Sequence, residues 1–102
     1  MKIQIDKYTL EFTLASISEA ENKYGLNIKA VQEIQDNPIS GVFLVIKSAL
    51  LEHHRTITDR EINDLINNCS DVLGLTQKLI EMWGDVLESI QSKEKNLKWE
   101  VV

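Results

Sequence analysis

The chain has 102 residues, of which 43% are hydrophobic and 26% are charged. This composition is typical of one folded domain of ordinary size and argues against a disordered chain. The formal net charge is −5. A protein that grips nucleic-acid phosphates needs a basic face, so we expect no nucleic-acid partner.

No apolar run approaches the length that a membrane span requires, so we expect no membrane partner. Cys69 is the one cysteine. An intramolecular disulfide is therefore impossible, which favours a reducing compartment. We expect a cytosolic protein.

The first residues predict a β-hairpin. Apolar and polar residues alternate in two short runs, Ile3–Ile5 and Tyr8–Phe12, and this is the pattern of half-buried strands. Asp6 and Lys7 lie between the runs and can form a tight turn. One long bent strand is the alternative that the alternation leaves open.

A helix is expected directly after the hairpin. Ser16 is a good N-cap residue, and Glu19 three positions later completes a capping box. Ser18 with Glu21 offers the same chemistry two positions on. Gly25 is expected to end the helix in the left-handed conformation.

The middle of the chain predicts two further helices. Asn27 can cap a short one, which places three apolar residues on one face: Ile28, Val31 and Ile34. Asn37 and Pro38 suit the start of the next. The stretch Val42–Leu51 is apolar nearly all round, which indicates a central helix. Its first half could instead be a buried strand, but the length of the pattern favours a helix.

Two more helices complete the expected fold. After a polar break at Glu52–Thr56, Thr58 and Glu61 form a capping box. That helix is expected to end at Asn67-Asn68, and Ser70 is expected to cap a long final helix. The final helix carries an apolar seam, Val72, Leu75, Leu79, Trp83, Val86 and Ile90, which Leu73, Ile80 and Leu87 widen.

The sequence therefore predicts an α+β fold that is mostly α: an N-terminal β-hairpin packed on a bundle of about five helices. Residues 1–96 form a single domain, and residues 97–102 form a C-terminal tail. Leu97, Trp99 and Val101 alternate along this tail. Such a segment can add a strand to the hairpin or to a partner. A frayed end is the alternative.

No motif predicts catalysis. His53 and His54 are adjacent, so they would not converge on one metal ion, and a zinc site needs three or four ligands. They suit a solvated helix end. The close carboxylate pairs, Glu19 with Glu21 and Asp59 with Glu61, fall in first turns of helices, where capping explains them. We expect no catalytic, cofactor-binding or metal-binding residues, and no enzyme.

A helix-turn-helix is a further interpretation of residues 59–75 and the helix that follows. The second helix would present Asp71, Glu81 and Asp85, which repel phosphates, so DNA binding is disfavoured.

One group of residues suggests a protein-binding face. An excess of apolar residues on the two long helices, beyond what one small core covers, would leave a patch for a partner or for a homo-oligomer. A well-filled core of a monomer is the alternative that the pattern leaves open. We predict that Met82, Trp83, Trp99 and Val101 bind the partner, since tryptophan and methionine are frequent in binding hot spots. The alternative for Trp83 is a place in the core.

Residues 8–90 resemble a known family. The resemblance rests on a strand Tyr8–Thr13, a helix Ser18–Tyr24 followed by Gly25-Leu26, and the apolar helix Val42–Leu51. A Thr58–Glu61 helix start, an Ile-rich turn and a long final helix follow. This pattern is similar to that of the small tail assembly chaperones of long-tailed, siphovirus-like phages and prophages. The polar stretch Glu52–Arg55 departs from it, because the family often has small residues there.

The resemblance implies a mainly helical domain that does no chemistry. It implies binding to the long, aggregation-prone tape measure protein during tail assembly, with recruitment of tail tube subunits as a second role. The protein would act in the cytoplasm of the bacterial host and be absent from the mature virion. Whether a longer, frameshifted form exists stays open. The alternative from another class is a small acidic regulatory or antitoxin-like protein-binding module.

Overall fold

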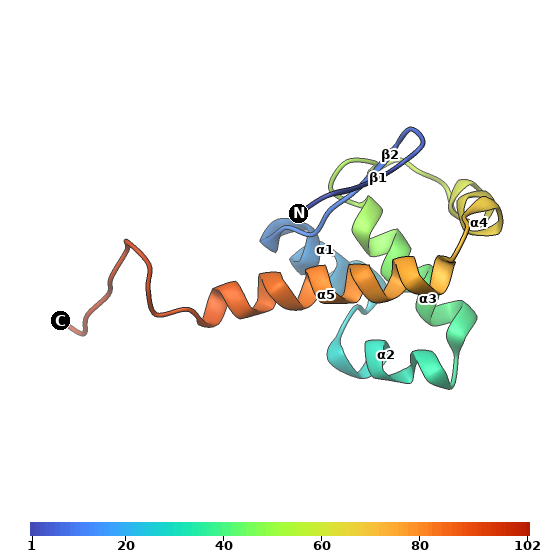
Figure 1. The fold of residues 1–102 in the computed structure, drawn as a ribbon. Helices are drawn as coiled ribbons and strands as arrows, with labels where there is room; N and C mark the ends of the chain where they lie inside the picture. Colours follow the sequence, from blue (N-terminus) through green and yellow to red (C-terminus); the bar gives the residue numbers. More distant parts are fainter.

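The computed structural model describes all residues 1–102 and consists of a hairpin followed by helices. In chain order the elements are β1 (Ile3–Ile5), β2 (Tyr8–Leu10), α1 (Leu14–Tyr24), α2 (Ile28–Gln32), a 3-10 helix (Glu33–Gln35), α3 (Pro38–Leu50), α4 (Asp59–Asn68) and α5 (Val72–Gln91). Figure 1 shows the hairpin lying across one side of the helices. The predicted α+β, mostly helical class is confirmed.

The hairpin forms as predicted. β1 and β2 pair antiparallel, with Ile5 opposite Tyr8. Asp6 adopts a φ of 50° in the turn, a left-handed conformation that Asp tolerates better than most residues. The side chain of Leu10 is fully buried, so the inner face of the hairpin lies on the core.

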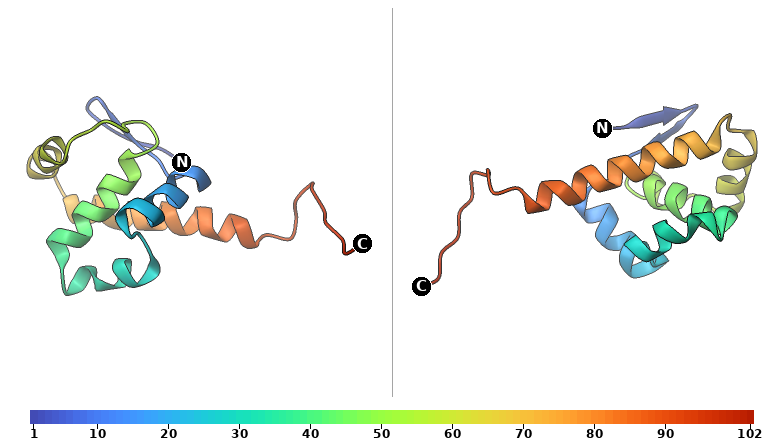
Figure 2. Two further views of the ribbon diagram at one scale, coloured as in Figure 1. Left: turned by 180° about the vertical axis from the view of Figure 1, so that it is seen from behind. Right: turned by 60° about the horizontal axis from the view of Figure 1, so that its bottom comes forward.

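Helix α3 lies at the centre of the fold, also as predicted. It packs against β2, α1, α4 and α5, and Figure 2 shows α5 crossing it. Ile46, Ala49 and Leu50 have no exposed surface. Burial on all sides explains why the segment is apolar nearly all round.

The helix caps are confirmed at three places. Gly25 ends α1 with a φ of 74°. The Asn27 side chain accepts a hydrogen bond from the Ala30 backbone N–H at 2.8 Å. Thr58 forms a capping box with Glu61 at the start of α4.

The predicted N-cap of α1 is wrong. Thr13, not Ser16, is the cap: the Thr13 hydroxyl accepts from the Ser16 N–H at 3.0 Å, and the Ser16 hydroxyl accepts from the Thr13 N–H at 2.9 Å. Ser16 thus occupies the N3 position of the capping box, which was predicted to be Glu19. The Glu19 side chain is therefore free to contact another element.

The predicted cap of α5 is wrong by one residue. Asp71 is the N-cap rather than Ser70, and its carboxylate accepts from the Gly74 N–H at 3.2 Å. Asp71 has a φ of 49°. The carboxylate is the better acceptor at a helix N-terminus, because its charge also favours the positive end of the helix dipole.

Helix α5 extends beyond the rest of the domain. Leu79 is fully buried, whereas Leu73 and Ile90, near its two ends, are 62% and 56% exposed. Both belong to the apolar pattern that the sequence shows for this helix. Residues 92–102 form neither helix nor strand and project away from the body (Figure 1). The sheet keeps two strands, so the tail does not pair with its own hairpin.

No helix in the structure has both the length and the apolar character needed to cross a membrane.

Candidate functional site

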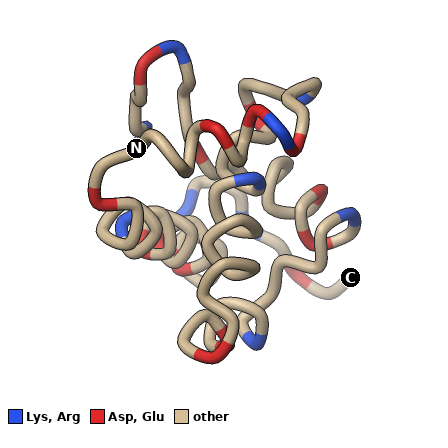
Figure 3. The backbone as a smooth tube through the Cα atoms, turned by 90° about the vertical axis from the view of Figure 1, so that its right-hand side faces the viewer, with Lys and Arg blue, Asp and Glu red and all other residues tan.

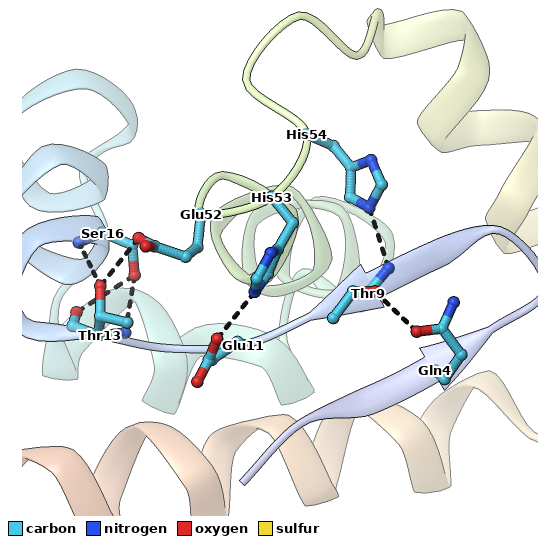
Figure 4. A network of polar contacts seen from close by, with 8 residues as sticks. All are labelled: Gln4, Thr9, Glu11, Thr13, Ser16, Glu52, His53 and His54. Atoms are coloured by element: carbon cyan, nitrogen blue, oxygen red, sulfur yellow. Dashed lines mark hydrogen bonds and ion pairs between the residues drawn. The ribbon is translucent and has the colours of Figure 1, made fainter.

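The loop after α3 holds the N-terminal part of the chain through four consecutive side chains, Glu52–Arg55, here called the polar clasp. Glu52 accepts from the Thr13 hydroxyl at 3.0 Å, and His53 Nε2 lies 2.8 Å from a Glu11 carboxylate oxygen. His54 Nε2 accepts from the Thr9 backbone N–H at 2.9 Å (Figure 4). Arg55 donates to both carboxylate oxygens of Glu19 at 2.8 and 2.6 Å.

The polar clasp changes the acidity of its partners. The hydrogen bond from His53 holds the pKa of Glu11 below its ordinary value. The hydrogen bond from Arg55 does the same for the pKa of Glu19, and Glu19 in turn raises the pKa of Arg55. Both carboxylates are therefore stabilised in the ionised form.

The polar clasp corrects two interpretations. His53 is exposed just after α3, as expected of a solvated helix end, and it also contacts Glu11. His54 was expected in the same setting, but it is half-buried, accepts from the Thr9 N–H, and its ring meets Tyr8 edge to face at 5.3 Å between centroids. Glu19 was expected to cap α1 and instead pairs with Arg55. The sequence carried no local signal for these contacts, because they join residues more than thirty positions apart.

A hollow of about 520 Å³ lies beside the polar clasp, with Lys7, Tyr8, Glu52, His53, His54, Arg55, Thr56, Ile57 and Glu61 as its lining. The side chains of His53, His54 and Arg55 already contact the N-terminal segment and α1. No three His, Cys, Asp or Glu side chains are grouped so that they could hold a metal ion. The groups at the clasp are arranged to join segments of the chain.

A second hollow, of about 710 Å³, lies between α2 and the C-terminal half of α5. We call it the α2–α5 groove. Its apolar lining is Leu26, Ile28, Trp83 and Leu87, and its polar lining is Glu21, Asn22, Asn27 and Lys29. Ile28 is 59% exposed, whereas Leu26 and Trp83 are buried. The exposed apolar surface of the groove therefore comes from Ile28 and, in part, from the half-buried Leu87.

The structure separates the four residues predicted to bind a partner. Met82 and Trp83 belong to the core, at 3% and 8% exposed. Trp83 thus has the core position that was the alternative to a partner-binding role. The buried Trp83 Nε1 has no hydrogen-bond acceptor. Trp99 and Val101 are 88% and 90% exposed on the projecting tail.

Core position does not remove Met82 and Trp83 from every surface. Trp83 lines the α2–α5 groove. Met82 lines a smaller hollow of about 210 Å³, beside Met1, Phe12 and Val86. The C-terminal half of α5 is therefore bordered by two hollows. Each is lined by one of the residues predicted to bind a partner.

Sequence reasoning missed a third surface at the other end of α5. A hollow of about 300 Å³, here called the α3–α4 groove, is lined by Pro38, Ile39, Val42, Phe43, Asn63, Ile66, Asn67, Val72 and Leu73. Ile39 is 86% exposed and Leu73 is 62% exposed. The available signal was Ile39 itself, a large apolar residue beside Pro38 in the first turn of a helix.

Charged residues do not gather on one side of the molecule. In Figure 3 the basic and acidic residues are interspersed along the backbone. Five ion pairs join several of them, including Lys47 with Asp59 at 2.9 Å.

These features define a small, mostly helical α+β domain whose uncovered surfaces include two apolar grooves. The chain belongs to the family described as a domain of unknown function, DUF5055, whose model matches residues 2–102. No curated protein and no solved structure matches the chain.

Proposed function

We propose that this domain is a tail assembly chaperone of a long-tailed phage or prophage. In this proposal it binds apolar helical stripes of the tape measure protein and keeps that protein soluble during assembly. The observation that carries the proposal is the α2–α5 groove, a hollow of mixed apolar and polar lining beside the last helix of an acidic domain, with the apolar Ile28 exposed in it. The sequence resemblance supplies the partner.

The apolar face of α5 that borders the groove continues past it to Ile90, at a spacing that suits a helical partner. Trp83, Leu87 and Ile90 are spaced by four and three residues, so they follow one face of α5. Leu87 is half-buried, and Ile90 is 56% exposed. An amphipathic helix laid along this face would meet side chains at the spacing of its own apolar stripe.

Burial on binding would favour the complex. Full burial of an exposed isoleucine side chain contributes roughly 1.5–3 kcal/mol, and Ile28 and Ile90 are 59% and 56% exposed. The cost of association offsets part of this gain. We therefore expect reversible binding, as a chaperone that leaves the finished tail requires.

The charge of the domain suits the same role. The domain has a net charge of −5. A partner coated with several copies would therefore be strongly negative, and such complexes would repel one another rather than aggregate. Recruitment of tail tube subunits belongs to the proposal as a second role, for which we assign no surface.

Co-expression with the long helical protein encoded directly downstream tests the proposal. The wild-type chain should raise the soluble fraction of that protein and co-purify with it. Ile28→Lys, which places a charge in the groove, should abolish co-purification. Leu14→Lys is the matched control, because Leu14 is 56% exposed on α1 and does not line the groove.

Two results would count against the proposal. If the wild-type chain leaves its downstream neighbour insoluble, the regulatory or antitoxin-like module becomes the better interpretation. If Ile28→Lys captures the neighbour as well as Leu14→Lys does, the binding face lies elsewhere.

A further inference from the structure

We infer that this chain associates with itself head to tail, with the C-terminal segment of one copy (residues 92–102) docked in the α3–α4 groove of the next. This self-association concerns a different surface from the α2–α5 groove and does not depend on a tape measure partner.

The C-terminal segment presents an apolar edge that its own domain leaves bare. Leu97, Trp99 and Val101 are 95%, 88% and 90% exposed. Lys98 and Glu100 lie between them, so in an extended conformation the three apolar side chains share one side. A tryptophan flanked by aliphatic residues is an effective anchor for a pocket.

The α3–α4 groove offers the complementary surface. Six of its nine lining residues are hydrophobic, and two of these, Ile39 and Leu73, stand largely exposed at 86% and 62%. The Phe43 ring is among the lining residues, which provides an aromatic surface for Trp99. Large apolar residues exposed together in this way mark interaction sites more often than isolated ones do.

The hairpin is a less suitable site for the same segment. On the outer edge of β2, the Thr9 N–H is bonded to His54 and the Glu11 N–H to the Ala49 carbonyl. On β1, the Gln4 side-chain amide donates to the Asp6 carbonyl at 2.8 Å. The outer edge of β2 therefore lacks the run of unpaired groups that strand addition needs, and β1 is only three residues long.

Geometry favours a second copy over the segment's own groove. The groove lies at the start of α5 and the segment follows its end, with Leu73 and Gln91 about 27 Å apart along the helix. The chain from Gln91 to Trp99 spans at most about 28 Å when fully extended. Trp99 would reach its own groove only on a fully stretched chain, which costs conformational entropy that a second copy avoids.

Charge also favours this pairing. The C-terminal segment carries three lysines, at positions 93, 95 and 98, and two glutamates, at positions 94 and 100, whereas acidic residues outnumber basic ones in the rest of the chain. Asp36 and Asp71 are exposed and lie two residues before Pro38 and one residue before Val72, both of which line the groove. Opposite charges at the rim steer the segment toward the groove and weaken with salt.

A contact between two different surfaces is heterologous, so each bound copy still offers a free groove and a free segment. Such contacts produce rings or open chains rather than closed dimers. The segment is short, so the contact is small and we expect it to be weak and concentration-dependent.

Sedimentation analysis over a range of concentrations tests the inference with two complementary variants. Trp99→Ala disables the segment, and Leu73→Lys disables the groove. Each variant alone should stay monomeric where the wild-type chain associates, with an association constant lower by at least about tenfold, which corresponds to about 1.4 kcal/mol. An equimolar mixture should form a one-to-one heterodimer, because one intact segment then meets one intact groove. Leu14→Lys is the control and should associate like the wild type.

Two outcomes would overturn the inference. One is a wild-type chain that remains monomeric at every concentration. The other is a failure of the variants to complement each other, seen as association that survives a single variant or as an equimolar mixture that stays monomeric. Both substituted side chains are mainly exposed, and circular dichroism confirms that each variant is folded. Capture of the downstream protein at concentrations where the chain is monomeric separates this test from that of the proposed function.

Discussion

Trp83 and Trp99 provide a matched pair for testing where the core of this domain ends. Trp83 is 8% exposed and belongs to the core cluster, whereas Trp99 is 88% exposed. Truncating a buried tryptophan removes its packing and leaves a cavity, so Trp83→Ala should lower the free energy of unfolding by roughly 3–5 kcal/mol. At roughly 4–8 °C per kcal/mol for a domain of this size, the Tm should fall by about 12 °C or more. Trp99→Ala should change the free energy by less than about 0.5 kcal/mol.

A third variant separates packing from hydrogen bonding at the same position. The buried Trp83 Nε1 has no acceptor, and leaving such a group unpaired costs roughly 1–3 kcal/mol. Trp83→Phe removes this cost and leaves a smaller cavity than alanine does, so it should destabilise the domain much less than Trp83→Ala. Urea denaturation followed by circular dichroism measures all three variants. If Trp83→Ala costs no more than Trp99→Ala, the placement of Trp83 in the core is wrong.

The remaining predictions concern two glycines and the polar clasp. Gly25→Ala should cost roughly 1–2 kcal/mol, because Gly25 has a φ of 74°. Gly84→Ala should instead stabilise by roughly 0.5–1 kcal/mol, since the added methyl in helix α5 meets no atom within 4 Å. Thermal denaturation measures both variants. If both raise or both lower the stability, the different backbone conformations assigned to the two glycines are wrong. The hydrogen bond from Arg55 lowers the pKa of Glu19 from its ordinary value of 4.5. The ion pair therefore contributes fully to stability above pH 4.5, and this contribution is lost as the pH falls through the lowered pKa. Arg55→Gln should therefore destabilise at neutral pH and flatten the decline of stability in acid; an unchanged pH profile would show that the ion pair is not formed in solution.

The local elements could be predicted from the sequence because their signals are local. The alternation of the hairpin, Gly25 at the end of α1 and the Thr58–Glu61 capping box are each contained within a few residues. The cap of α1 was misplaced because Thr13 and Ser16 compete with an equally good nearby signal. Capping residues fix helix boundaries only to within a few positions.

The tertiary features could not be predicted in the same way. The polar clasp joins residues far apart in sequence, such as Arg55 and Glu19, and its hydrogen bonds exist only once α3 has packed on the hairpin. Leu73 and Ile90, near the two ends of α5, are exposed despite their apolar character, because the neighbouring elements cover only part of this helix. Periodicity identifies an apolar face but not how much of it the rest of the chain covers.

Chemical-shift mapping on this 11.7 kDa chain tests the central claim most directly. The titrant is a synthetic amphipathic helical peptide, which represents the apolar stripe that the proposed tape measure partner would present. The proposal predicts saturable shifts that cluster at Leu26, Ile28 and Leu87 in the α2–α5 groove, with line broadening of the Trp83 indole signal. Shifts confined to another surface, or none at concentrations where the peptide is soluble, would contradict it.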